Sequence, residues 1–340
     1  MCGIFFVFPV QKMPVNLAVL DVFHPQIRAA IAAAIPSDWT VHFLEENSLA
    51  ARATLIREAD IVFVMAAPMP KELLAEARKL RLIQKLGAGL DKIDLDICRA
   101  RGVGVARLQA GNSIPVAEHT ILLMLATYRQ LPQIDRRTRA GNWNKEDARG
   151  THRTLQHKRV GLVGFGAIGK EVAKRLRGFN VNIIYYDPVH APVDVEQSLG
   201  VTYSDLDALL READIVSLHL PLLPQTKNII DARRIGTMKQ GAVLINCARG
   251  GLVDEAALAE ALRTGRLMGA GIDAFSQEPP GGNPLLELDN TVVTPHLAGA
   301  TLDNIATVVA RSVENAKTVL RGEPLPADDV AVAPGKMPAD

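Results

Sequence analysis

The stretch of residues 160–187 constrains the fold of this 340-residue chain more than any other part of it. An apolar run at 160–163 predicts a buried strand, and three glycines follow in G-x-G-x-x-G spacing. Residues 167–176 then predict a helix, and 181–186 a second strand that ends in Asp187, 18 residues after the last glycine. Together these parts indicate a βαβ unit that binds a dinucleotide, rather than an ordinary glycine-rich turn.

Each glycine of this stretch has its own physical role. Gly164 allows a tight turn, Gly166 lets the backbone approach a pyrophosphate, and Gly169 lets the helix pack closely on the strand. The helix N-terminus, which includes Ala167 and Ile168, offers free N–H groups and positive potential to the phosphates.

Asp187 selects the cofactor. Its carboxylate can accept hydrogen bonds from the adenosine ribose hydroxyls, whereas it would repel a 2′-phosphate. The next residues, Pro188, Val189 and His190, include no Arg or Lys that would neutralise such a phosphate. The sequence therefore favours NAD over NADP.

The length predicts two domains, because 340 residues exceed what one core usually contains. A formal net charge of +1 without a basic block argues against nucleic acid and membranes as partners. No apolar run approaches the roughly 18 residues that a membrane-spanning helix needs. Residues 1–12 are expected to be an extension and not a signal peptide, because no positive charge precedes their apolar run.

The three cysteines, Cys2, Cys98 and Cys247, lie far apart in the sequence. They form neither a metal-ligand spacing nor a disulfide framework. We therefore expect no metal site and a cytoplasmic location, where thiols stay reduced.

Short apolar runs alternate with helical patterns along much of the chain. The expected strands are residues 17–20, 41–44, 61–64, 82–86, 103–106, 215–218, 243–246, 271–273 and 292–293. The further expected helices are residues 26–34, 49–58, 71–78, 95–101, 116–139 with a break at Pro132, and 302–320. Such alternation is typical of parallel sheets covered by helices.

The predicted fold class is therefore α/β, with two doubly wound parallel-sheet domains. A Rossmann NAD-binding domain at 108–298 is expected to be inserted into a flavodoxin-like substrate domain made of residues 1–107 and 299–326. A tail at 327–340, rich in Pro, Ala and Asp, is expected to be disordered.

Three polar residues follow expected strands of the NAD domain, on the side where ligands bind in such sheets: Arg249, Glu278 and His296. Histidine can donate or accept a proton near neutrality, and a carboxylate can fix its tautomer. Arginine offers a planar fork to a carboxylate. The trio suits hydride transfer at a 2-hydroxy acid, although each residue taken alone has an ordinary structural explanation.

The stretches N-x-A-R-G, D-x-F-x-x-E-P and P-H-x-x-x around these residues resemble the D-isomer-specific 2-hydroxyacid dehydrogenase family. This family includes phosphoglycerate dehydrogenases and glyoxylate/hydroxypyruvate reductases, and the resemblance covers residues 15–326. It implies that Arg249 binds the substrate carboxylate, that His296 is the catalytic acid and base, and that Glu278 pairs with it.

The same resemblance implies further site residues. Substrate contacts would come from the backbone of Gly87, Ala88 and Gly89 and from Asn112. Cofactor contacts would include His219, Pro221, Thr226, Cys247, Ala248, Asp273 and Ala298, with Asp273 near the nicotinamide amide. Trp143 would belong to an arm at 141–143 that reaches the partner subunit of a homodimer, with the long preceding helix in the interface.

The residues after the third expected strand bear on the substrate. Phosphoglycerate dehydrogenases typically carry Arg-Ser there, whereas residues 63–69 of this chain contain neither Arg nor a hydroxyl. The expected substrate is therefore a small unphosphorylated 2-keto or 2-hydroxy acid. D-3-phosphoglycerate, phosphite, and a corepressor-like role in NADH sensing are the alternatives, and formate is disfavoured because formate dehydrogenases carry Gln in place of Glu278.

Overall fold

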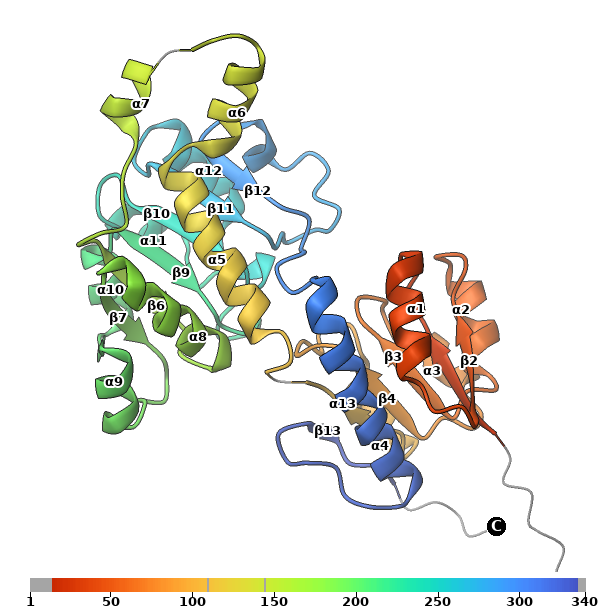
Figure 1. Ribbon diagram of the computed structural model, residues 1–340. Coiled ribbons are helices and arrows are strands. Elements are labelled where there is room, and N and C mark those ends of the chain that lie inside the picture. The colour runs from red at the N-terminus through yellow and green to blue at the C-terminus, as the bar shows by residue number, and fades with distance from the viewer. Residues whose placement is uncertain (1–13, 109, 144, 336–340) are drawn as a thin grey trace, which may run out of the picture. The chain divides into compact units, whose positions relative to one another are not determined.

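The computed structural model describes residues 14–108, 110–143 and 145–335 (Figure 1). The chain forms two compact units, one made of Asn112–Thr301 and the other of the residues up to Gly111 and from Leu302 onward. One unit is thus inserted into the other, with crossings three or four residues beyond the expected boundaries. Residues 1–12, which were expected to be an extension, lie outside the described residues.

The discontinuous unit contains a six-stranded sheet with the order β13-β5-β4-β3-β1-β2. Its parallel strands are β1 (Val15–Val19), β2 (Trp39–Phe43), β3 (Ile61–Val64), β4 (Leu82–Lys85) and β5 (Gly104–Ala106). Its helices are α1 (Pro25–Ala34), α2 (Leu49–Ile56), α3 (Lys71–Glu76), α4 (Leu95–Ala100) and α13 (Leu302–Leu320). The order 2-1-3-4-5 is that of a flavodoxin-like sheet.

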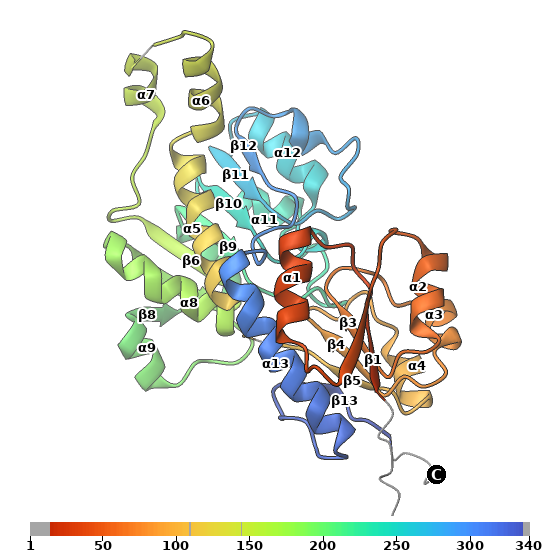
Figure 2. The ribbon, with the colours of Figure 1, turned by 45° about the vertical axis from the view of Figure 1, so that its right-hand side comes forward.

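Successive residues of these strands point to opposite faces of the sheet. Leu17 and Val19 pack with α1 and α13, which lie side by side (Figure 2), whereas Ala18 packs with α2, α3 and α4. Both faces are covered at the centre of the sheet, which is why β3 is a continuous apolar run in the sequence.

The inserted unit contains a seven-stranded sheet with the order β12-β11-β10-β9-β6-β7-β8. Its strands, all parallel, are β6 (Arg159–Val163), β7 (Asn182–Tyr186), β8 (Val201–Tyr203), β9 (Ile215–Leu218), β10 (Val243–Asn246), β11 (Gly269–Ile272) and β12 (Thr291–Val293). Counted from β6, the first six have the order 3-2-1-4-5-6 of a Rossmann sheet, with the switch point between β6 and β9. The predicted fold class is confirmed.

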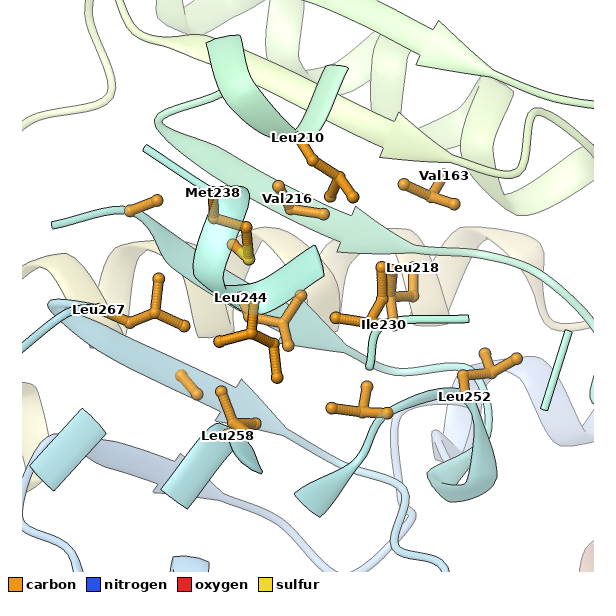
Figure 3. Packing of buried hydrophobic residues seen from close by; sticks show 14 of the residues in the cluster. Val163, Leu210, Val216, Leu218, Ile230, Met238, Leu244, Leu252, Leu258 and Leu267 are labelled. Carbon is orange, nitrogen blue, oxygen red and sulfur yellow. The ribbon is translucent and has the colours of Figure 1, made fainter. Parts of the chain in front are cut away.

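Helices cover both faces of this sheet. The α-helices of the inserted unit are α5 (Ser113–Tyr128), α6 (Leu131–Arg139), α7 (Lys145–Thr151), α8 (Ala167–Leu176), α9 (Val193–Leu199), α10 (Leu206–Glu212), α11 (Ala232–Thr237) and α12 (Glu255–Arg263). Helices α10, α11 and α12 pack on one face, where Leu210, Leu244 and Leu258 belong to one buried cluster (Figure 3), and α5 and α8 pack on the other. Each fully buried leucine contributes about 1.5–3 kcal/mol to stability, so this core fixes the strand ends firmly.

The helical pattern expected at 116–139 is divided into α5 and α6. Gln130 has a φ of 47°, in the left-handed region, and the chain turns there. Pro132 lies in the first turn of α6, where its missing N–H costs nothing. The break expected at Pro132 is therefore present, two residues earlier.

The prediction of a disordered tail from residue 327 is wrong as far as Gly335. Strand β13 (Val330–Val332) pairs antiparallel with β5, and Asp329 is fully buried. The Asp329 carboxylate accepts hydrogen bonds from Arg311 at 2.9 and 2.7 Å and from Asn315 at 3.0 Å. This order comes from tertiary contacts, which a Pro- and Ala-rich composition does not reveal. Residues 336–340 lie outside the described part.

No helix within the described residues is both long enough and apolar enough to cross a membrane.

Candidate active site

The glycine loop follows β6 at the switch point of the Rossmann sheet. Gly164 has a φ of 101°, and a Cβ there would lie 2.7 Å from the carbonyl carbon of His219 in the loop after β9. A Cβ on Gly169 would lie 2.5 Å from the carbonyl oxygen of Gly164. Packing within the protein therefore requires both of these glycines.

Gly166 is different, because a Cβ there would meet no atom within 4 Å. It is the N-cap of α8, and no side chain caps the helix there. The N–H groups of the first turn, at Ala167 and Ile168, are thus left at the positive end of the helix dipole beside open backbone. This arrangement can receive an anion such as a pyrophosphate.

Asp187 directly follows β7 and is held beside the glycine loop. One carboxylate oxygen accepts the N–H of Phe165 at 2.8 Å, and the other accepts the N–H of Val189 at 3.0 Å. Each oxygen retains a further lone pair for a hydroxyl donor. The ring of the nearby His190 stacks on Tyr203, with centroids 3.6 Å apart.

The loop after β9 contributes His219, Pro221 and Thr226. The His219 Nε2 lies 3.0 Å from Ser217 Oγ, and burial lowers the pKa of His219 to about 4. The imidazole is therefore neutral at pH 7. A neutral ring suits a residue that lines a cofactor site better than one that acts as an acid catalyst. Thr226 Oγ1 donates to the Pro221 carbonyl at 2.7 Å and so closes this loop.

Arg249 lies in a turn that Asn246 braces. The buried Asn246 side chain donates to the Arg249 carbonyl at 2.8 Å and accepts the N–H of Ala248 at 3.0 Å. A Cβ on Gly250 would lie 1.8 Å from the carbonyl carbon of Phe275, so the turn rests directly on the backbone after β11. Burial raises the pKa of the Cys247 thiol to about 12, which keeps it protonated and unreactive.

Glu278 and His296 form a close pair. The distance between Glu278 Oε1 and His296 Nδ1 is 2.6 Å, and the imidazole is 42% exposed. Because the carboxylate can only accept a hydrogen bond, Nδ1 carries the proton. The other ring nitrogen, Nε2, has no part in this pair and can exchange a proton with a reactant. His296 has a φ of 52°, a left-handed conformation that is costly for a residue with a Cβ.

The loop that carries Glu278 is tied to the start of α12. The Glu255 carboxylate accepts the Ser276 N–H at 2.6 Å, the Ser276 hydroxyl at 2.8 Å and the Asn283 amide at 2.5 Å. Glu255 is a site residue that the sequence reasoning missed. No local signal marks it, because its role arises only when residues 276–283 fold back over α12.

The segment that carries His296 is held by Asp273, whose side chain is fully buried. The Asp273 carboxylate accepts the Thr294 hydroxyl at 2.6 Å and the N–H groups of Leu297 at 2.9 Å and Ala298 at 3.0 Å. Its backbone carbonyl accepts the N–H of His296 at 2.8 Å. Asp273 thus organises this segment, while its contact with the nicotinamide amide stays a prediction.

The expected substrate residues divide between the two units. Asn112, the N-cap of α5, adjoins Gly299, where a Cβ would lie 2.8 Å from the Asn112 amide nitrogen. The buried Asn112 Oδ1 has no hydrogen-bond partner among the described residues, and its contact with a substrate stays a prediction. Gly87, Ala88 and Gly89 follow β4 in the discontinuous unit, and their role stays a prediction.

The carboxyl edge of the Rossmann sheet therefore gathers the glycine loop, Asp187, Arg249 and the Glu278–His296 pair, each after a different strand. In the described residues, no group of three side chains is placed to bind a metal ion. A glycine loop that can receive a dinucleotide, a carboxylate–histidine pair and an arginine are the parts expected of an oxidoreductase that acts on organic acids.

Comparison with known proteins agrees with this class. Residues 121–298 match the family model described as "D-isomer specific 2-hydroxyacid dehydrogenase, NAD binding domain". The chain belongs to the D-isomer-specific 2-hydroxyacid dehydrogenase family, and these residues are its NAD-binding domain.

Individual relatives differ in their named substrates. The chain is 40% identical over 270 residues to D-3-phosphoglycerate dehydrogenase of Methanocaldococcus jannaschii, covering 79% of this chain and 51% of that protein. It is 38% identical over 268 residues to hydroxypyruvate reductase of Thermotoga maritima, covering 78% of this chain and 85% of that protein. The chain thus spans only about half the length of the first of these relatives.

A solved structure of D-lactate dehydrogenase from Aquifex aeolicus, complexed with NAD and lactic acid, is also similar. It superimposes with a TM-score of 0.80 at 28% identity, covering 94% of this chain and 100% of that one.

Proposed function

We propose that this chain catalyses the NAD-dependent interconversion of a 2-hydroxy acid and the corresponding 2-keto acid. The observation that carries the proposal is the 2.6 Å pair between Glu278 and His296, on the same sheet edge as Arg249 and the glycine loop. Proton transfer, carboxylate binding and dinucleotide binding are the three functions that such a reaction needs.

The residues at this edge fit NAD. The open backbone at Gly166 and the uncapped N-terminus of α8 would hold the pyrophosphate, and Asp187 would accept the ribose hydroxyls. His219, Pro221 and Thr226 would line the adenosine side, with Cys247, Ala248 and Ala298 as further contacts. When bound, the nicotinamide supplies or accepts the hydride at C2 of the acid.

The chain's own residues handle the proton and the carboxylate. With Nδ1–H directed to Glu278, His296 Nε2 takes the hydroxyl proton during oxidation and returns it during reduction. The Glu278 carboxylate stabilises the imidazolium that forms in between. Arg249 would bind the substrate carboxylate through two parallel N–H groups and polarise the adjacent carbonyl oxygen.

For the substrate itself, we favour a small unphosphorylated acid such as glyoxylate or hydroxypyruvate. The loop after β3 supports this, because residues 63–69 include no Arg, Lys or hydroxyl that would bind a phosphate. The backbone N–H groups of Ala66 and Ala67 both donate to Asp21 at 2.8 Å, so the loop already uses them within the protein.

D-3-phosphoglycerate is the second candidate, and Lys85 favours it. This lysine ends β4, and its ammonium group donates to the carbonyl oxygen of Met65 in the loop after β3. The sequence reasoning counted only the loop and missed this neighbouring cation. The relatives named phosphoglycerate dehydrogenase also support this candidate.

The proposed activity is tested by NADH oxidation with a panel of 2-keto acids: glyoxylate, hydroxypyruvate, pyruvate and 3-phosphohydroxypyruvate. Fast turnover of one unphosphorylated acid is expected. Preference for the phosphorylated acid, lost selectively in Lys85→Met, would replace the favoured substrate by the second candidate. NADH binding without turnover of any acid would contradict the proposed activity and direct attention to phosphite or to NADH sensing.

We also infer a homodimer, formed through α5, α6 and the arm at 141–143. Leu122 and Leu131 are each 51% exposed, and Trp143 is 75% exposed. A partner subunit would cover these large apolar side chains. Sedimentation should give a dimer for the wild type and a monomer for Leu122→Arg. The control Val193→Arg changes another exposed apolar residue, on α9, and should remain dimeric. A monomeric wild type would contradict the inference.

A further inference from the structure

A second histidine, His119, lies in the polar cluster beneath the segment that carries His296. It belongs to α5, and its side chain is only 10% exposed. His119 Nε2 lies 3.0 Å from Thr294 Oγ1 and 3.7 Å from the nearer carboxylate oxygen of Asp273. His119 therefore joins a helix to a catalytic segment 175 residues away in the sequence.

The hydrogen-bond geometry fixes the direction of this chain of contacts. Thr294 has one hydroxyl proton, and the 2.6 Å distance to Asp273 Oδ1 shows that the proton is donated there, because a carboxylate only accepts. The Thr294 oxygen must then accept from His119, so His119 Nε2 carries a proton. The contacts run from His119 through Thr294 to Asp273.

Asp273 determines the shape of the catalytic segment. Its carboxylate and carbonyl accept the N–H groups of His296, Leu297 and Ala298. The segment needs this support because His296 has a φ of 52°, which a residue with a Cβ adopts only when its surroundings enforce it. A shift of Asp273 would therefore move the imidazole of His296.

The Asp273 carboxylate is fully buried, so its stability depends on the donors around it staying in place. The Cys247 thiol is another titratable group near it, and burial raises the pKa of that thiol to about 12. The thiol therefore stays neutral and adds no negative charge beside the Asp273 carboxylate. His119 holds one of these donors in place, because its Nε2 lies 3.0 Å from the Thr294 hydroxyl that donates to Asp273.

We propose that His119 is a positioning residue for His296, which acts through Thr294 to hold Asp273 and the segment 294–298 in place. The proposal deepens the proposed function, because it concerns the same acid–base site. It requires a donor at the position of the His119 Nε2 atom and does not place His119 in contact with the substrate.

Two variants of His119 distinguish the hydrogen-bond donor at Nε2 from the space that the side chain fills. His119→Gln places an amide N–H near the position of Nε2, whereas His119→Leu fills the space without a donor. Glu118→Gln is the matched control, because it changes the neighbouring residue on the exposed side of α5. The readouts are amide hydrogen exchange in 294–298 and steady-state kinetics with NADH.

In His119→Leu, exchange in 294–298 should be about tenfold faster and kcat about tenfold lower, the equivalent of one hydrogen bond lost from a buried network. The KM for NADH and exchange in β6 should not change, which separates a local effect from unfolding. His119→Gln and Glu118→Gln should both resemble the wild type.

Wild-type exchange in His119→Leu would overturn the proposal, and so would equal losses in His119→Gln and His119→Leu, since the donor would then be irrelevant. Hydrogen exchange does not depend on turnover. If the wild type reduces no 2-keto acid, the proposed function fails, while the exchange comparison still decides the role of His119.

Discussion

At the scale of single residues, the Glu278–His296 pair explains how one imidazole can serve both directions of the reaction. The carboxylate orients the ring through Nδ1 at 2.6 Å and offsets the positive charge of the imidazolium. Glu278→Gln keeps the size and a hydrogen-bond acceptor but removes the charge. We expect kcat for keto-acid reduction to fall by about 10–100-fold, within the range of general acid–base effects.

We expect a single residue, Asp187, to set the choice between NAD and NADP as well. Asp187 presents two oxygens whose backbone partners are Phe165 and Val189. The double variant Asp187→Ala, Val189→Arg removes a negative charge and adds a positive one at a position that is 76% exposed. The ratio of kcat/KM for NADP to that for NAD should rise at least tenfold, the effect of about 1.4 kcal/mol. An unchanged ratio would remove Asp187 from the ribose site.

At the scale of elements, the catalytic side chains depend on backbone packing between loops. A Cβ on Gly250 would lie 1.8 Å from the Phe275 carbonyl carbon and 2.0 Å from the Ser276 nitrogen, so Gly250→Ala must push the Arg249 and Glu278 loops apart. We expect a loss of about 1–3 kcal/mol in stability, typical of overpacking, and at least a tenfold loss in kcat.

The matched control for this prediction is Gly236→Ala in α11, where a Cβ would meet no atom within 4 Å. It should leave kcat unchanged, and a gain in helix propensity should offset any small cost. Urea unfolding and steady-state kinetics of both variants provide the comparison. Equal behaviour of the two alanine variants would contradict the close packing of the loops.

Local signals in the sequence predict elements well, as α8, β9, β10 and α13 show, each with the bounds that the structure has. These elements are predicted by signals that are local in the sequence, namely the spacing of apolar residues and the glycines nearby. Glu255 and Asp273 illustrate what cannot be predicted in this way. Glu255 holds Ser276 and Asn283, and Asp273 holds Leu297 and Ala298, partners that only the completed fold brings together.

At the scale of the whole molecule, the C-terminal segment belongs to the structure of the discontinuous unit. The buried Asp329 links Arg311 and Asn315 of α13 to β13, and its carbonyl accepts the N–H of Arg107 after β5. The amino-acid composition did not predict that this segment is ordered, because its order depends on one buried carboxylate and on a strand of only three residues. Prediction of the inserted-domain arrangement succeeded because strand–helix alternation extends over many residues.

This arrangement gives a prediction for Asp329→Asn. The variant removes the negative charge that pairs with the Arg311 guanidinium. Only the Asp329 side of this ion pair is buried, since the Arg311 side chain is 46% exposed. We expect a loss of about 1–3 kcal/mol, below the cost of breaking a fully buried pair. Because Asp329 belongs to the other unit, the affinity for NADH should be unchanged. If Asp329→Asn unfolded at the same urea midpoint as the wild type, this would contradict the structural role of the C-terminal segment.

The most direct test of the proposed mechanism is the rate of NADH oxidation by His296→Ala with the best 2-keto acid, measured at saturating NADH against the wild type. We expect a 10²–10⁴-fold fall in kcat with little change in NADH affinity, because the lost group transfers the proton and does not bind the cofactor. A kcat within about twofold of the wild type would show that His296 is not the acid–base catalyst and would contradict the proposed mechanism.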